Sequence, residues 1–150
     1  MEPNYYPPVG FYFAVTFKDR SDTLDSQFQS VSGLSVDIET EEYAEGGENR
    51  FKHKLPVRTK YPNLVLKRGL LIDSELIKWC RKAIENFEFE PQNLLVSLYD
   101  DSKNPLMTWS LEGCFPVKWV VDDLNAMEGK IVVETIELAY KYFTIIKGKE

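Results

Sequence analysis

The chain has 150 residues, of which 43% are apolar and 28% charged, and its formal net charge is -6 at pH 7. This length suits one domain with one hydrophobic core, and the acidic balance argues against broad nucleic-acid binding, which needs a dominant basic surface. No apolar run approaches the roughly 20 residues of a membrane helix, and the N-terminus MEPNYYPPVG lacks the basic and apolar regions of a signal peptide. We therefore expect a protein that is made in the cytoplasm and binds no membrane stably.

Cysteine and histidine are scarce, which limits the chemistry that the chain can perform. Cys80 and Cys114 are too few for a disulfide scaffold and are expected to be small buried residues. The single histidine, His53, excludes a zinc site built on several histidines. It lies between Lys52 and Lys54 in a polar segment, which is a poor setting for a catalytic base. The sequence therefore predicts no catalytic residue, no cofactor and no metal site.

The N-terminal third predicts an arm and two strands. Residues 1–10 contain three prolines, which favour an extended arm. FYFAVTFK alternates between apolar and other residues, and LSVDIETEEY alternates again, as expected of strands. In the second run Leu34, Val36 and Ile38 are expected to face the core. The carboxylates of Asp37, Glu39 and Glu41 then line the other face, which should be wet because like charges repel each other.

The next segment, residues 43–62, reads YAEGGENRFKHKLPVRTKYP and shows little periodicity. EGGEN matches no phosphate-binding pattern, and Glu45 and Glu48 would repel a phosphate. Long segments without secondary structure are uncommon in small domains and usually serve binding. With two glycines, several aromatics and both charge signs, this segment is predicted to be a docking arm whose turn is set by Gly46 and Gly47.

Residues 63–91 predict a strand followed by a helix. NLVLKRG reads as a short strand, in which Arg68 is better explained as a charged strand end than as an anion contact. The helix is expected from about Ser74 to Phe87, with Asp73 as its N-cap and Ile72 and Ile77 as a hydrophobic staple. The apolar stripe expected to face the core comprises Leu76, Ile77, Cys80, Ala83, Ile84 and Phe87.

The last sixty residues read as strands. QNLLVSLYD and LMTWSLEG form a predicted hairpin, and CFPVKWVVDDL is expected to be an edge, a bulge or a bend because of Pro116. A single strand over Ile131–Ile146 would span about 50 Å, so it either bends or belongs to a sheet larger than one chain. The predicted fold is mainly β: one domain over residues 1–150, a small β-sandwich or barrel with one packed α-helix and a long protruding loop.

Several motifs in this order resemble those of the inner tube proteins of contractile phage tails and phage-like injection systems. The resemblance covers about residues 10–146, and no single motif is diagnostic. The motifs are FQSVSGL (28–34), YAEGGENRFKHKLP (43–56), NLVLKRGL (63–70), Trp79 in the helix, NLLVSLYD (93–100), FPVKW (115–119) and VVETIELAY (132–140).

The resemblance implies a structural protein without an active site or cofactor. Its subunits would form six-membered rings that stack into a tube around a lumen, with sheath and baseplate or hub proteins as partners and protein or DNA cargo passing through. Assembly would take place in the bacterial cytoplasm, before the tube becomes part of a virion or an injection particle. Asp37, Glu39 and Glu41 would face the lumen and repel anionic cargo. The arm would contact neighbouring subunits through Tyr43, Glu45, Gly46, Gly47, Glu48, Asn49, Arg50, Lys52, Leu55 and Pro56.

Alternatives stay open from the sequence. The C-terminal run YKYFTIIKGKE continues where some main tube proteins end with a histidine-glycine pair, so a minor tube protein or an initiator ring beside the baseplate is an alternative to a main tube subunit. In another class, the chain would be a small-ligand-binding β-barrel with the loop as its lid, and in a third an enzyme with acidic residues as acid and base. Particle mass separates a tube protein from a binding protein, which stays small.

Overall fold

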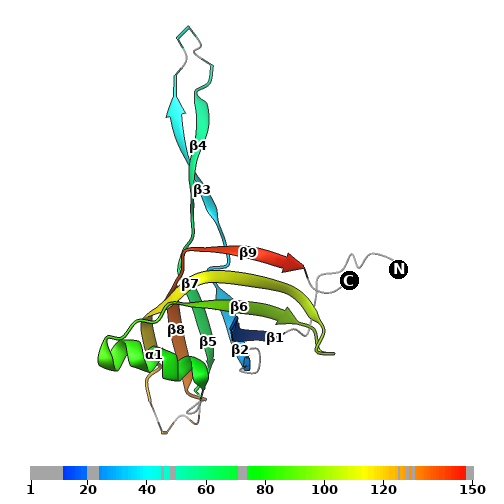
Figure 1. Ribbon diagram of the computed structural model, residues 1–150, viewed down its shortest axis with the longest axis vertical. Coiled ribbons are helices and arrows are strands. Elements are labelled where there is room, and N and C mark those ends of the chain that lie inside the picture. The colour runs from blue at the N-terminus through cyan, green and yellow to red at the C-terminus, as the bar shows by residue number, and fades with distance from the viewer. Residues whose placement is uncertain are drawn as a thin grey trace.

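The structure is a computed structural model that describes residues 12–19, 24–44, 46–47, 50–70, 74–124, 126–127, 129 and 131–147. The predicted N-terminal arm over residues 1–10 lies outside them. The elements, drawn in Figure 1, are β1 (Tyr12–Phe17), β2 (Leu24–Ser32), β3 (Asp37–Tyr43), β4 (His53–Lys60), β5 (Leu64–Gly69), α1 (Glu75–Asn86), β6 (Gln92–Tyr99), β7 (Pro105–Val121), β8 (Val133–Ala139) and β9 (Tyr142–Lys147).

Seven of these strands form one curled antiparallel sheet. Their order is β6-β1-β2-β5-β8-β7-β9, and β6 also pairs with the first part of β7. β9 adds to the other side of that same part of β7, so the ring of strands is not a true barrel. β3 and β4 form a separate two-stranded sheet that projects from this body (Figure 1). The prediction of a mainly β fold with one helix and a protruding segment is confirmed.

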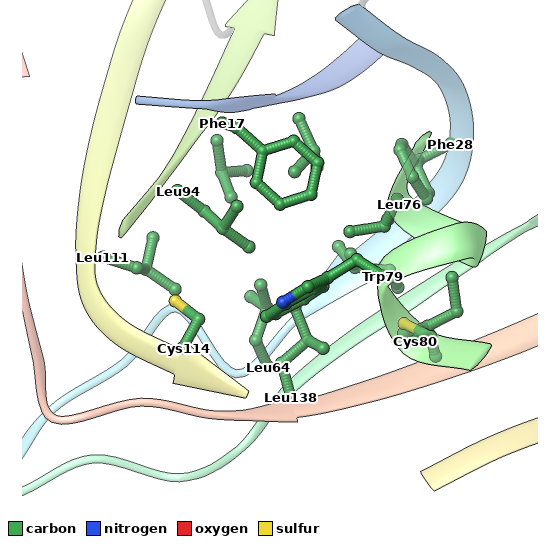
Figure 2. Close-up of a cluster of buried hydrophobic side chains, with 14 of the residues drawn as sticks. Phe17, Phe28, Leu64, Leu76, Trp79, Cys80, Leu94, Leu111, Cys114 and Leu138 are labelled. Atoms are coloured by element: carbon green, nitrogen blue, oxygen red, sulfur yellow. The ribbon is translucent and has the colours of Figure 1, made fainter. Parts of the chain in front are cut away.

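The core lies between the inward faces of the curled sheet and the helix (Figure 2). Alternate residues of β5, β6 and β8 are fully buried there, and Trp79 of α1 meets Phe17 edge to face at 5.6 Å between ring centroids. Cys80 and Cys114 are buried free thiols, as predicted, and burial raises the pKa of Cys114 to about 12. The core cluster comprises Val15, Phe17, Phe28, Leu64, Leu66, Leu76, Ile77, Trp79, Cys80, Leu94, Val96, Leu111, Cys114, Ile136 and Leu138.

A buried ion pair joins the sheet to the helix. Arg68 and Glu134 are direct partners on β5 and β8, 1% and 0% exposed, and Arg68 Nε lies 2.8 Å from Glu134 Oε1. Arg68 Nη2 also donates to Ser74 Oγ at 2.6 Å, and Trp119 Nε1 donates to Glu134 Oε2 at 3.2 Å. Arg68 is therefore neither an anion contact nor a charged strand end: it is a buried cross-link between β5, β8 and the start of α1.

The helix begins one residue later than expected. Ser74 is the N-cap, because its Oγ accepts a hydrogen bond from Ile77 N at 3.1 Å while Arg68 holds the same hydroxyl in place. Asp73 is thus not the N-cap, and the proposed staple through Ile72 lies outside the described residues. The predicted core stripe is correct for its first four members, but Ile84 and Phe87 are exposed.

The structure decides two further expectations about strands, and the bulge expected at Pro116 is confirmed by a register shift between Pro116 and Lys118. The segments on either side of Gly113 are one continuous strand, β7, because the register shift beside Pro116 accommodates the proline. Ile131–Ile146 does not form one long strand: it bends after Ala139, so β8 pairs with the second half of β7 and β9 with the first half. Of the two outcomes that the sequence left open, the bend is the one observed.

Candidate assembly surface on the β3–β4 ribbon

Part of the predicted docking arm belongs to a β-ribbon, which we define as β3 and β4 together with their connecting turn. The expectation of a segment without regular structure was wrong for residues 53–60, which pair with β3. Glu39 opposes Arg58 and Thr40 opposes Pro56, so Val57 is an extra residue in a bulge. The proline and the bulge break the alternation of β4, which explains why the sequence pattern did not indicate a strand. The alternation of residues 34–43 before a Gly-Gly pair was the available signal for a hairpin.

The ribbon continues two strands of the body through a tightly packed base. β2 leads into β3, and β4 leads into β5. Gly33 has a φ of +93°, and a Cβ at this position would overlap the carbonyl oxygen of Asn63 on the opposing segment. Tyr140 Oη donates to Gly33 O at 3.0 Å, and the rings of Tyr61, Tyr140 and Phe143 pack together with centroids 5.2–6.3 Å apart. These contacts fix where the ribbon leaves the body.

Apolar side chains of the ribbon are exposed to solvent. Val36 and Ile38 were expected to face the core, but the chain has left the body at Gly33, and Ile38 is 63% exposed. An isolated two-stranded hairpin is marginally stable in water at best, and a cluster of exposed apolar residues is typical of an interaction surface. The exposed apolar side chains of this segment are Val36, Ile38, Tyr43, Phe51, Leu55 and Val57.

The three predicted lumen carboxylates share one face of β3, but they do not form an unopposed acidic row. Asp37 lies opposite Lys60, and Glu39 opposite Arg58, with Arg58 Nε 2.8 Å from Glu39 Oε2. Glu41 lies opposite Leu55. Because the ion pair is exposed, it adds little stability, but it offsets part of the negative field of this face. The proposal that the face lines a lumen stays a prediction.

The outer part of the ribbon gathers aromatic rings around the single histidine. His53 stacks on Tyr43 at 5.1 Å and meets Phe51 edge to face at the same centroid distance. Gly46 and Gly47 are exposed in the turn, and Gly47 has a φ of +91°. Arg50, Lys52, Leu55 and Pro56 are also exposed, whereas Glu45, Glu48 and Asn49 lie outside the described residues.

A second exposed apolar surface was missed from the sequence. It is a groove between the end of α1 and the middle of β7, lined by Ala83, Ile84, Phe87, Phe89, Phe115, Pro116 and Val117. Phe87 meets Phe89 edge to face at 4.9 Å, and Phe89 meets Phe115 at 6.2 Å. The sequence pattern had assigned Ile84 and Phe87 to the core stripe, and the spacing of FEFEP after the helix was the only hint of this groove.

The described residues contain no group of three or more His, Cys, Asp and Glu side chains arranged to hold a metal ion. Within the same part of the chain, no helix is long and apolar enough to cross a membrane. The interior of the curled sheet is filled by leucine and isoleucine side chains at 0% exposure, and the ribbon points away from it (Figure 1). A ligand-binding barrel with the ribbon as its lid is therefore not supported.

A curled sheet covered by one helix and extended by a ribbon is a fold that other solved structures share. A solved structure of Hcp1 from Flavobacterium johnsoniae shares it, with a TM-score of 0.58 at 16% identity over 91% of this chain and 96% of that one. The sequence matches the family described as T4-like virus tail tube protein gp19 over residues 9–144, and the chain belongs to this family. A search of curated protein sequences gave no match.

Three solved structures of contractile particles contain chains similar to this one. A chain of the anti-feeding prophage baseplate has a TM-score of 0.80 at 26% identity over 98% of both chains. A chain of the PVC sheath-tube complex, an extracellular contractile injection system in its extended state, has a TM-score of 0.75 at 27% identity over 96% of this chain and 93% of that one. A chain of the anti-feeding prophage cap, which terminates the tube, has a TM-score of 0.78 at 26% identity over 98% of this chain and 95% of that one. The chain is thus a structural protein of the tail tube type.

Proposed function

We propose that this chain is a repeating subunit of the inner tube of a contractile phage tail or phage-like injection particle, in which six-membered rings stack around a lumen. The observation that carries the proposal is the β3–β4 ribbon. It projects from a body that has its own core, and its exposed apolar side chains need a partner that the described part of the chain does not provide. Membership of the tail tube family makes a second copy of the chain the natural partner.

The ribbon would contact neighbouring subunits through the predicted arm residues. Leu55 and Tyr43 would bury apolar area, and Arg50 and Lys52 would pair with charges of the neighbour. The full set is Tyr43, Glu45, Gly46, Gly47, Glu48, Asn49, Arg50, Lys52, Leu55 and Pro56.

The edge of β9 would contribute to ring closure. Among the described strands, β9 pairs only with β7, so its other edge is unpaired, and Tyr142, Ile145 and Ile146 are exposed on it. An unpaired apolar edge favours uncontrolled association unless another chain covers it. A heterologous contact repeated by rotation closes a ring and leaves no such edge.

The similar structures support further partners and a location. They come from baseplate, sheath-tube and cap assemblies, so sheath and baseplate or hub proteins are the proposed partners beside the chain itself. Both a main tube subunit and an initiator ring beside the baseplate agree with this set. Assembly is proposed to occur in the bacterial cytoplasm before the particle is released.

The lumen proposal concerns the carboxylate face of β3. Asp37, Glu39 and Glu41 would line the wall and repel anionic cargo, whether protein or DNA. Changing all three to the corresponding amides should alter cargo loading into assembled tubes. Unchanged loading in tubes of normal length would refute a lumen position for this face.

Negative-stain electron microscopy of the purified protein tests the central proposal. We expect rings or stacked tubes, alone or when the neighbouring gene products supply a nucleating ring. Light scattering should report particles far larger than the 17.4 kDa chain. A protein that stays monomeric at all concentrations, with and without those gene products, would contradict a tube function.

A further inference from the structure

We propose that the groove at the end of α1 receives the ribbon of the next copy along the tube axis. The inference rests on the proposed tube function and adds to it the receiving site of the ribbon. Its starting point is that the ribbon projects from one side of the body along the longest axis, whereas α1, whose end borders the groove, lies on the side of the body away from the ribbon (Figure 1). Copies related by a shift along this axis would therefore bring a ribbon to a groove at each step.

Phe87 is the residue that indicates a contact with another molecule at the groove. It ends the helix with a φ of 53°, and Glu88 N donates to Lys82 O at 3.2 Å, closing the last turn. Glycine or asparagine is favoured at this left-handed position, because a side chain with a bulky Cβ substituent is strained there. The ring is nonetheless 81% exposed in the monomer. An aromatic residue at this position therefore serves neither the helix end nor the core.

The ribbon offers side chains that match the groove. Ile38 and Val57 are exposed apolar residues. Ile38 lies on the same face of the ribbon as Thr40 and its partner Pro56, and Val57 is the bulge residue next to Pro56. Burying them against Ile84 and Phe87 would remove apolar surface of both copies from water. The described residues of the same chain cover neither surface in this way.

The charges around the two surfaces are complementary in sign. β3 carries four acids and no base: Asp37, Glu39, Glu41 and Glu42. β4 carries three bases and no acid: Lys54, Arg58 and Lys60. The helix beside the groove carries three bases, Lys78, Arg81 and Lys82, of which the first two pair with Glu75 and Glu85 of the same helix. Glu88 and Glu90 follow its end. A ribbon placed with β3 toward the helix and β4 toward the acidic segment pairs both strands with opposite charges, which fixes its direction in the groove.

A second copy of the chain also fits the number of contact surfaces. Every chain carries one ribbon and one groove, so the contact is heterologous and propagates one to one without a further component. A sheath protein is the competing occupant, and the experiments below separate the two.

Cross-linking tests the contact in assembled protein. The double variant with Ile38→Cys and Phe87→Cys in the same chain should give a ladder of linked chains on a denaturing gel after treatment with a short bismaleimide. The native Cys80 and Cys114 are 1% and 0% exposed and contribute no background in the folded state. The control pairs Ile38→Cys with Leu106→Cys at the far end of β7 and should give no ladder. Tubes that form normally without a ladder from the first pair would overturn the inference and leave the tube function standing, whereas absence of any ring or tube would overturn both.

Phe87→Asn tests the energetic role of the groove without threatening the fold. Asparagine suits the left-handed helix end, so the melting temperature of the monomer should be unchanged or raised, while the protein concentration needed for stacking rises at least tenfold. Leu124→Asn, at another exposed apolar residue, is the matched control and should stack normally. Normal stacking of Phe87→Asn would overturn the inference, and normal stacking with lost sheath binding would assign the groove to the sheath instead.

Discussion

The buried pair between Arg68 and Glu134 allows a quantitative prediction for Glu134→Gln. The substitution keeps the size of the side chain but removes its charge and one of its two acceptor oxygens. Arg68, 1% exposed, would then hold a buried positive charge without a counter-charge, and either it or Trp119 would lose its acceptor. Removing one partner of a buried pair costs about 3–5 kcal/mol. For a domain of this size we expect a fall in melting temperature of about 6–20 °C.

Denaturant unfolding of dilute protein, followed by tryptophan fluorescence, measures this loss, because Trp119 contacts the pair directly. The double variant Arg68→Met with Glu134→Leu is the matched control. Because it removes both charges, it should recover at least half of the unfolding free energy that Glu134→Gln loses. The Trp119 N–H stays unpaired in this variant, and that cost of about 1–3 kcal/mol is not recovered. A loss below about 1 kcal/mol for Glu134→Gln, or a double variant less stable than the single one, would refute the view that desolvation of an unpaired charge dominates here.

Three further predictions follow from the ribbon and the core. Gly33→Ala should cost more than about 2 kcal/mol of unfolding free energy, because a Cβ at its φ of +93° meets Asn63. Gly46→Ala is the control: its Cβ would meet open space, so it should cost less than about 0.5 kcal/mol. Comparable urea midpoints for the two variants would contradict this reasoning. Gly46→Val combined with Gly47→Val should leave the monomer folded but block ring stacking in negative-stain images, and tubes of normal length would remove the docking role of the turn. Burial raises the folded-state pKa of Cys114 from 9.0, and that of Tyr140 from 10.0, in each case to about 12, so both groups ionise first in the unfolded chain. The contribution of these two groups to stability should therefore be constant below about pH 9 and be lost as pH rises from there toward 12. The fall should be less steep in Tyr140→Phe, and a flat profile between about pH 9 and 12 would disprove the reasoning.

The parts of the fold that could be predicted are those with a regular period inside one element. β1 and the first turns of α1 have uninterrupted apolar alternation or stripes, and the core bears them out. The pattern of residues 34–38 was misleading because alternation shows which side chains share a face, not whether a body lies against that face. β4 was missed because Pro56 and the extra Val57 disturb the alternation locally. The role of Ser74 depends on Arg68, six residues earlier, and no local propensity contains that contact.

The candidate site was predicted in position but not in form. The length and mixed composition of residues 43–62 indicated a docking segment, and the structure places Tyr43 and residues 53–60 of it in a two-stranded sheet. The opposition of Asp37 and Glu39 to Lys60 and Arg58 depends on the register of the ribbon, which a single strand pattern does not contain. The groove could not be predicted because its two sides, the helix end and the middle of β7, are almost thirty residues apart in the chain.

Tyr140 has a mechanical consequence for a protein of this kind. Its hydroxyl holds Gly33 at the base of the ribbon, and the residue itself occupies the bend at which β8 ends and β9 begins. Axial force on the ribbon of one subunit is therefore transmitted to the sheet at Tyr140, where the chain bends from β8 into β9. We expect tilting of the ribbon and displacement of the β9 edge to be coupled, so that thrust along a stack of subunits is shared with the contacts around each ring. We therefore expect a tube of such subunits to resist compression and torsion through the same aromatic side chains at the ribbon base.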